Sequence, residues 1–108
     1  MGQLQVIARY TIAAGNEDEV MALLPALAEA SQAEPGNLAF QIYRRHGDDR
    51  DVVLLERYAS RDAFAAHRAS AHFEDLVLGR IAPLLDSRVV EVFEATDEFS
   101  TGEGSTLP

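Results

Sequence analysis

The stretch that decides the fold is "LAFQIYRRHGDDRDVVLLERY", residues 38–58. Two runs rich in β-branched, aromatic and other apolar side chains, residues 38–45 and 51–58, flank the polar segment "HGDDR". Such runs joined by a short segment that contains Gly-Asp indicate a β-hairpin. The middle of the chain therefore predicts a pair of antiparallel strands.

Towards the N-terminus, the hairpin is preceded by an expected helix and an expected strand. Residues 3–12, "QLQVIARYTI", alternate apolar and polar side chains as a half-buried strand does. Asn16 is the expected N-cap of the helix, because three acidic residues follow it and suit the positive end of a helix. The segment "EPGN" at 34–37 is expected to end this helix, since Pro and Gly together stop helices.

Towards the C-terminus, a second helix and a last strand are expected. Ser60 is the expected cap of a helix that carries Phe64 and His67, and a bend is expected near Ser70 before a second helical stretch. Pro83 is expected to end that stretch, and residues 87–96 have the character of a strand. The order of strands and helices predicts an α+β fold, the ferredoxin-like βαββαβ arrangement with a four-stranded antiparallel sheet and helices on one face.

Two segments, "VVLL" at 52–55 and "VVEVF" at 89–93, put apolar side chains on both faces of the sheet, and both are expected to be central strands. The protein's own helices can cover only one face. An uncovered apolar face favours aggregation, so a partner is expected there. A second copy related by a two-fold axis is the simplest partner, and the sequence predicts a homodimer.

Composition bounds the organisation of the chain and its partners. The 108 residues are expected to form one domain, residues 1–96, followed by a flexible acidic tail, residues 97–108, rich in Gly, Ser and Thr. A net charge of −9 excludes the basic stripe typical of nucleic-acid binding and disfavours anionic membranes. The sequence shows neither the basic first segment of a signal peptide nor the apolar run of about 20 residues of a transmembrane helix, so a cytoplasmic location is expected.

Two residue types are absent, and their absence limits the chemistry. The chain has no Cys, and its nine basic residues are all Arg. Thiol nucleophiles, Schiff-base lysines and the lysine of a phosphate-binding loop are therefore excluded. Proton transfer must depend on His, Tyr, Asp or Glu.

The histidines and the acid of the third strand are candidate site residues. His67 lies three residues after Phe64 and is expected to face the core on the same side of the helix. His72 lies five residues further on, on a different face if the helix is continuous, and no third ligand has a suitable spacing; the sequence therefore predicts no metal site. Glu56 shares a strand face with apolar side chains, so either an Arg partner or a role in a pocket is expected.

"EPGNLAF" at 34–40 and "LLERYASRDAFAAHRASAHF" at 54–73 resemble the antibiotic-biosynthesis monooxygenase domain family. Members of this family show Glu-Pro-Gly before the second strand, Glu-x-aromatic at the end of the third, and then His-x-x-x-x-His-Phe. The resemblance covers about residues 3–96 and implies a dimeric α+β barrel. Three positions differ from the best oxygenase patterns: Leu54 replaces a polar amide, Tyr58 replaces Trp, and Ala71 replaces Pro.

The resemblance implies a monooxygenase that oxidises a small aromatic or polycyclic phenol or quinol with dioxygen and without a cofactor. It implies His67 as general base, with Tyr58 and Glu56 as further catalytic candidates. The expected substrate-binding residues are His72, Tyr43, Phe40, Phe64 and Phe73. Two alternatives stay open: an isomerase or lyase that uses His67 for proton transfer beside a carbonyl, and a dimeric ligand-binding module without catalysis.

Overall fold

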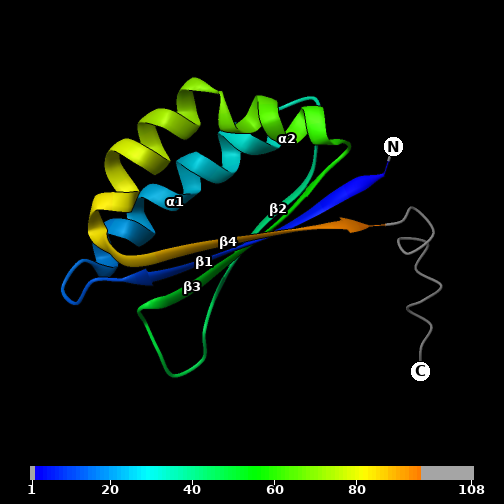
Figure 1. The fold of residues 1–108 in the computed structure, drawn as a ribbon. Coiled ribbons are helices and arrows are strands. Elements are labelled where there is room, and N and C mark those ends of the chain that lie inside the picture. Colours follow the sequence, from blue (N-terminus) through cyan, green and yellow to red (C-terminus); the bar gives the residue numbers. More distant parts are fainter. Residues whose placement is uncertain (1, 96–108) are drawn as a thin grey trace, which may run out of the picture.

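A computed structural model describes residues 2–95 of the chain, and the expected tail at 97–108 lies outside the described residues. Four strands form one antiparallel sheet, and all helices lie on one of its faces (Figure 1). The elements follow the order predicted from the sequence. They are β1 (Gln3–Ile12), α1 (Glu17–Gln32), β2 (Asn37–Arg44), β3 (Asp51–Tyr58), α2 (Arg61–Arg68), the π-helix η1 (Phe73–Ile81), the short 3₁₀-helix η2 (Ala82–Leu84) and β4 (Leu85–Ala95).

The strand order in the sheet is β2-β3-β1-β4, and each neighbouring pair is antiparallel. This order confirms the predicted ferredoxin-like fold. The expectation that residues 89–93 lie in a central strand is wrong, because β4 pairs only with β1 and forms an edge of the sheet. Its apolar side chains are therefore more exposed than those of β3. Within residues 2–95, no helix is both long enough and apolar enough to cross a membrane.

The core lies between the sheet and the helices, and the alternation in the strands sets it there. In β1 and β3 every second residue is buried, whereas the residues between them lie on the face away from the helices. Helix α1 covers the buried face with Val20, Leu24 and Leu27. Glu56 is the one charged residue among the buried positions of these two strands.

Serine hydroxyl groups fix the start of α2 and the break between α2 and η1. Ser60 begins α2 as predicted, since its Oγ accepts a hydrogen bond from the backbone N–H of Ala63 at 3.1 Å. Ser70 lies in the break, donating from its Oγ to the carbonyl of His67 at 2.7 Å and accepting from the backbone N–H of Phe73 at 3.1 Å. The predicted bend near Ser70 is thus confirmed.

Asn16 is the N-cap residue of α1 as predicted, but it does not cap the helix with its side chain. Its side chain makes no capping hydrogen bond, and its amide instead donates to the carbonyl of Leu84 at 3.3 Å. This contact joins the start of α1 to the segment before β4.

Gly36 brings the segment after α1 against helix α2. A Cβ at this position would lie only 2.4 Å from the Cβ of Ala63 in α2. The carbonyl of Gly36 also accepts a hydrogen bond from the backbone N–H of Ala59 at 2.9 Å. The close approach of the two segments therefore requires glycine.

We predict that Gly36→Ala lowers the free energy of unfolding by about 1–3 kcal/mol, because α2 must move to admit the methyl group. Gly79→Ala is the matched control, since its Cβ would meet the nearest atom, the carbonyl oxygen of Glu74, at an ordinary 3.4 Å. Urea unfolding of both variants measures the difference. Equal stability of Gly36→Ala and the wild type would show that this approach is not tight.

Candidate active site

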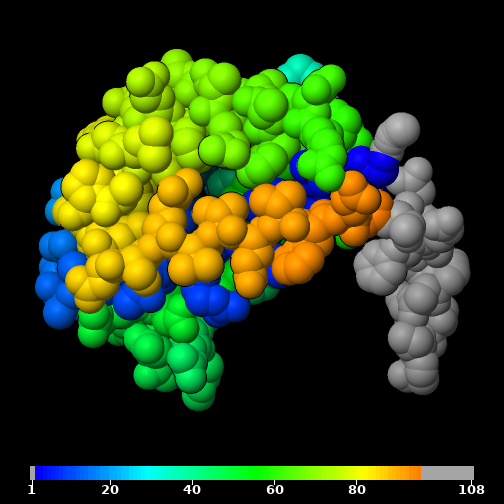
Figure 2. Space-filling view, viewed as in Figure 1, coloured from blue at the N-terminus to red at the C-terminus, as the bar shows by residue number. Residues whose placement is uncertain are grey.

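A cavity of about 240 Å³ lies between the sheet and the helical layer. It opens beside β4, where Figure 2 shows a hollow between the edge strand and the helices. Most of the residues that line it are apolar or aromatic, and its Glu, His and Arg side chains come from β3, α2 and β4. The lining includes Ala8, Tyr10, Leu27, Phe40, Leu54, Glu56, Phe64, His67, Arg68, Phe73, Val77, Arg88, Val90 and Val92.

His67 projects from α2 towards this cavity and is only 3% exposed. Its ring packs between aromatic side chains, with centroids 5.2 Å from Tyr58 and 5.3 Å from Phe73. Burial lowers the pKa of His67 below its usual value, although the carboxylate of Glu34 acts in the opposite direction. The imidazole is therefore neutral near pH 7.

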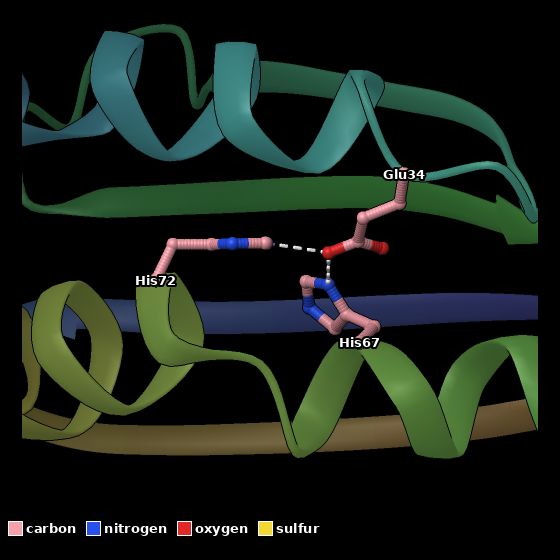
Figure 3. Close-up of side chains that lie close together, drawn as sticks. All are labelled: Glu34, His67 and His72. Atoms are coloured by element: carbon pink, nitrogen blue, oxygen red, sulfur yellow. Dashed lines mark hydrogen bonds and ion pairs between the residues drawn. The ribbon is translucent and has the colours of Figure 1, made fainter.

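Glu34 determines which nitrogen of the neutral His67 ring carries the proton. Its Oε2 lies 2.8 Å from His67 Nδ1 (Figure 3), and an ionised carboxylate can only accept a hydrogen bond. Nδ1 therefore carries the proton, and Nε2 keeps a free lone pair. A carboxylate that fixes the tautomer in this way also stabilises the imidazolium formed when Nε2 accepts a proton.

The same carboxylate oxygen also contacts His72, whose Nε2 lies 2.5 Å from Glu34 Oε2. The expectation that no third ligand lies near the two histidines is wrong. The break after α2 turns His72 back towards His67, and Glu34 reaches both rings from the segment after α1 (Figure 3). Glu34 was not among the predicted site residues, although it begins the "EPGN" motif at 34–37.

Glu56 and Tyr58 form a second buried pair at the cavity. The hydroxyl of Tyr58 donates to Glu56 Oε1 at 2.6 Å. Of the two expectations for Glu56, the structure therefore favours a place at a pocket over an arginine partner within residues 2–95. Burial raises the pKa of Glu56 to about 7, although the Tyr58 hydrogen bond opposes the shift. Burial, followed by the nearby Glu56 carboxylate, also raises the pKa of Tyr58, which stays protonated as a donor.

The two pairs meet at His67 Nε2, which lies 3.9 Å from Glu56 Oε1. Because the pKa of Glu56 is raised and that of His67 is lowered, both groups favour their neutral forms. At pH values just below 7 the contact is therefore mainly a neutral acid beside a neutral base rather than an ion pair. Such an arrangement can give and take protons at one end of an apolar cavity.

Two arginines complete the cavity wall. The guanidinium of Arg68 lies 5.6 Å from the centroid of the Phe64 ring, and that of Arg88 lies 5.6 Å from the centroid of the Phe73 ring. Neither makes a salt bridge with a carboxylate within residues 2–95. Stacking on aromatic rings holds both charges at the cavity, where they favour an anionic ligand.

The structure brings most of the predicted site residues together. Phe40, Phe64 and Phe73 line the cavity with His67 and Glu56, whereas Tyr58 lies behind Glu56 and His72 contacts Glu34. The prediction that Tyr43 binds substrate in this cavity is wrong. Tyr43 is 51% exposed on the opposite sheet face, because it lies three positions, an odd number, after Phe40 in β2.

The raised pKa of Glu56 predicts a pH-dependent stability. A carboxyl with a pKa of about 7 in the folded state and 4.5 when unperturbed binds its proton more tightly in the folded protein. The free energy of unfolding therefore falls as pH rises from about 4.5 to about 7, by up to about 3 kcal/mol from this group.

We predict that Glu56→Gln removes this loss, so that the variant gains stability over the wild type as pH rises through that window. Glu94→Gln is the control, since the Glu94 side chain is 72% exposed and pairs with Arg61 at the surface. Denaturant unfolding at several pH values measures the difference. Parallel curves for Glu56→Gln and the wild type would contradict the raised pKa.

Comparison with known proteins places this geometry in a family. The model of the antibiotic biosynthesis monooxygenase family matches residues 4–77. "Putative monooxygenase Rv0793" of Mycobacterium tuberculosis is 37% identical over 68 residues, which cover 63% of this chain and 66% of that protein. "Putative monooxygenase YcnE" of Bacillus subtilis is 28% identical over 60 residues, which cover 56% and 63%. The chain thus matches slightly under two thirds of the length of these two relatives.

Solved structures of similar proteins match the fold of this chain over a longer span than the sequence matches do. The structure of Rv0793 has a TM-score of 0.82 at 32% identity and covers 91% of this chain and 99% of that one. A structure from Caulobacter crescentus, described as a "putative antibiotic biosynthesis monooxygenase", has a TM-score of 0.82 at 26% identity and covers 89% and 92%. The chain belongs to the antibiotic biosynthesis monooxygenase family.

Proposed function

We propose that the protein is a monooxygenase that oxidises a small phenol or quinol with dioxygen and without a cofactor. The observation that carries this proposal is the contact of His67 Nδ1 with Glu34 Oε2 at 2.8 Å, which directs the basic Nε2 towards an apolar cavity beside Glu56. A cavity of about 240 Å³ is small for a ligand site and favours one or two rings over a larger polycycle.

The reaction begins with removal of a proton. Nε2 of His67 accepts the phenolic proton, and the carboxylate of Glu34 stabilises the imidazolium. The guanidinium groups of Arg68 and Arg88 stabilise the delocalised anion of the substrate at the cavity wall. This anion is electron-rich enough to pass one electron to dioxygen.

The later steps form a carbon–oxygen bond and then break the O–O bond of the peroxide. The substrate radical and superoxide combine, which forms a carbon–oxygen bond, and the imidazolium of His67 returns its proton to the peroxide. Loss of the hydrogen from that carbon and cleavage of the O–O bond give a carbonyl and water. The protonated carboxyl of Glu56, held by Tyr58, supplies the proton to the leaving oxygen and recovers one from the carbon.

A second candidate function is an isomerase or lyase that transfers a proton beside a carbonyl. The neutral acid and neutral base 3.9 Å apart favour it, because proton transfer between two carbon or oxygen atoms needs one of each. It consumes no dioxygen. Binding of an aromatic ligand without turnover would instead identify a ligand-binding module.

We predict that metal-free protein consumes dioxygen with hydroquinones of one or two rings, and that His67→Ala lowers turnover at least about 10²-fold because the base is lost. Oxygen-electrode assays with quinone detection measure both. His46→Ala is the control, since His46 lies in the exposed hairpin turn outside the cavity. Full turnover by a folded His67→Ala variant would show that the base is elsewhere.

We also propose that two copies associate through the sheet face opposite the helices, as a dimeric barrel. Tyr43, Val89 and Phe93 are about half exposed on this face, at 51%, 52% and 49%. Ile7 and Leu55 lie between them on the central strands and are only partly covered. An apolar face of this extent is stabilised by a partner with the same surface.

Light scattering of the chain at micromolar concentration is expected to give twice the monomer mass of 11.8 kDa. Phe93→Glu is expected to give the monomer mass, because it buries a charge in the interface. Leu78→Glu, at an equally exposed position of η1, is expected to leave the dimer intact. A monomeric wild type would rule out this association.

A further inference from the structure

We infer that Glu34, His67 and His72 form a binding site for one divalent transition-metal ion. Glu34 Oε2, His67 Nδ1 and His72 Nε2 all lie within 4.8 Å of one another. Two imidazole nitrogens and one carboxylate make a donor set that suits Zn²⁺, Co²⁺ or Fe²⁺ and leaves further coordination positions open. Mg²⁺ and Ca²⁺ prefer oxygen donors only.

The spacing between Glu34 Oε2 and each of the two histidine nitrogens is close to what an ion requires. Donors held about 2.1 Å from one ion are about 3 Å apart at neighbouring positions of an octahedron and slightly further apart in a tetrahedron. The contacts to Glu34 Oε2 are 2.8 Å from His67 and 2.5 Å from His72. A small outward movement of the rings therefore lets an ion replace the shared protons.

The charge and burial of Glu34 also favour a cation. Its side chain is 15% exposed, and its second oxygen, Oε1, is buried without a hydrogen-bond partner within residues 2–95. A buried acceptor without a partner is costly, and an ion held by both carboxylate oxygens would satisfy it. His72, 24% exposed, lies on the side from which an ion can enter.

The fold holds the three side chains from three separate segments, as Figure 3 shows. Glu34 follows α1, His67 lies in α2, and His72 directly precedes η1. The two serine hydrogen bonds at Ser70 fix the break between the histidines, and the tight approach of Gly36 to Ala63 fixes the Glu34 segment against α2. A site made by packed elements needs little reorganisation to bind.

Binding of an ion affects the proposed reaction, and only this consequence rests on the proposed function. An ion on Nδ1 of His67 uses the lone pair of that nitrogen, so the ring keeps its proton on Nε2. The ion-bound form then has no base at the cavity. The metal-free protein and the ion-bound protein are therefore two forms of one site, and only the first can accept the substrate proton.

The test is a titration of the chelator-treated protein with Co²⁺. Excess Mg²⁺ is present throughout, because Mg²⁺ occupies sites made only of carboxylates and leaves the histidine site to Co²⁺. We expect visible absorption bands that saturate at one Co²⁺ per chain. His72→Ala, or the milder His72→Gln, is expected to weaken binding at least about tenfold, whereas His46→Ala is expected to bind as the wild type does. Zn²⁺ is expected to raise the melting temperature of the wild type and His46→Ala but not of the His72 variants.

Three outcomes would overturn the inference: no saturable binding by the wild type, equal binding by folded His72 variants, or loss of binding in His46→Ala. Each is independent of turnover. Failure of the proposed oxidation in metal-free protein would therefore leave the ion site intact, and failure of Co²⁺ binding would leave the oxidation intact.

Discussion

One carboxylate oxygen, Oε2 of Glu34, joins the parts of the molecule on which the candidate site depends. It accepts from His67 in α2 and contacts His72 before η1, so it connects the segment after α1 to both sides of the helix break. This contact is possible because Gly36 lets its segment approach α2 closely. The orientation of the His67 ring, and with it the direction of its basic nitrogen, follows from this single acceptor.

The second constraint is the burial of ionisable groups in an apolar wall. Desolvation favours the neutral form of both Glu56 and His67, so it reduces the charge that these two side chains place at the cavity. The positive charge near the cavity comes instead from Arg68 and Arg88, held over phenylalanine rings. Neutral proton-transfer groups inside and cations at the wall suit the proposed deprotonation of a phenol.

Most of the fold could be predicted from the sequence because its signals are local. Alternation in β1 and β3, the polar hairpin turn and the Ser60 cap each depend on neighbours a few residues away, and each prediction is confirmed. The edge position of β4 could not be predicted from its pattern. Apolar residues on both faces of a strand occur in central strands and also in edge strands that a second chain covers. The face of Tyr43 was predictable from its spacing to Phe40 but was assigned wrongly.

The candidate site was predictable only in part. Phe64 and His67 share a helix face, and Glu56 shares a strand face with Leu54, so spacing alone placed them near the core. The partners of these groups come from far along the chain: Glu34 lies 33 residues from His67, and Arg88 reaches the cavity from the last strand. No local pattern shows such contacts, and the predicted bend near Ser70 did not by itself reveal that His72 turns back towards Glu34.

The central claim is that Glu34 holds His67 as a neutral imidazole with its proton on Nδ1. Long-range ¹H–¹⁵N correlation spectra of the metal-free protein test this claim directly, because protonated and unprotonated ring nitrogens have well-separated shifts. At slightly alkaline pH the account predicts a protonated Nδ1 and an unprotonated Nε2 for His67 in the wild type, and a mixture of tautomers in Glu34→Gln. A wild-type ring protonated on Nε2, or charged at that pH, would contradict it.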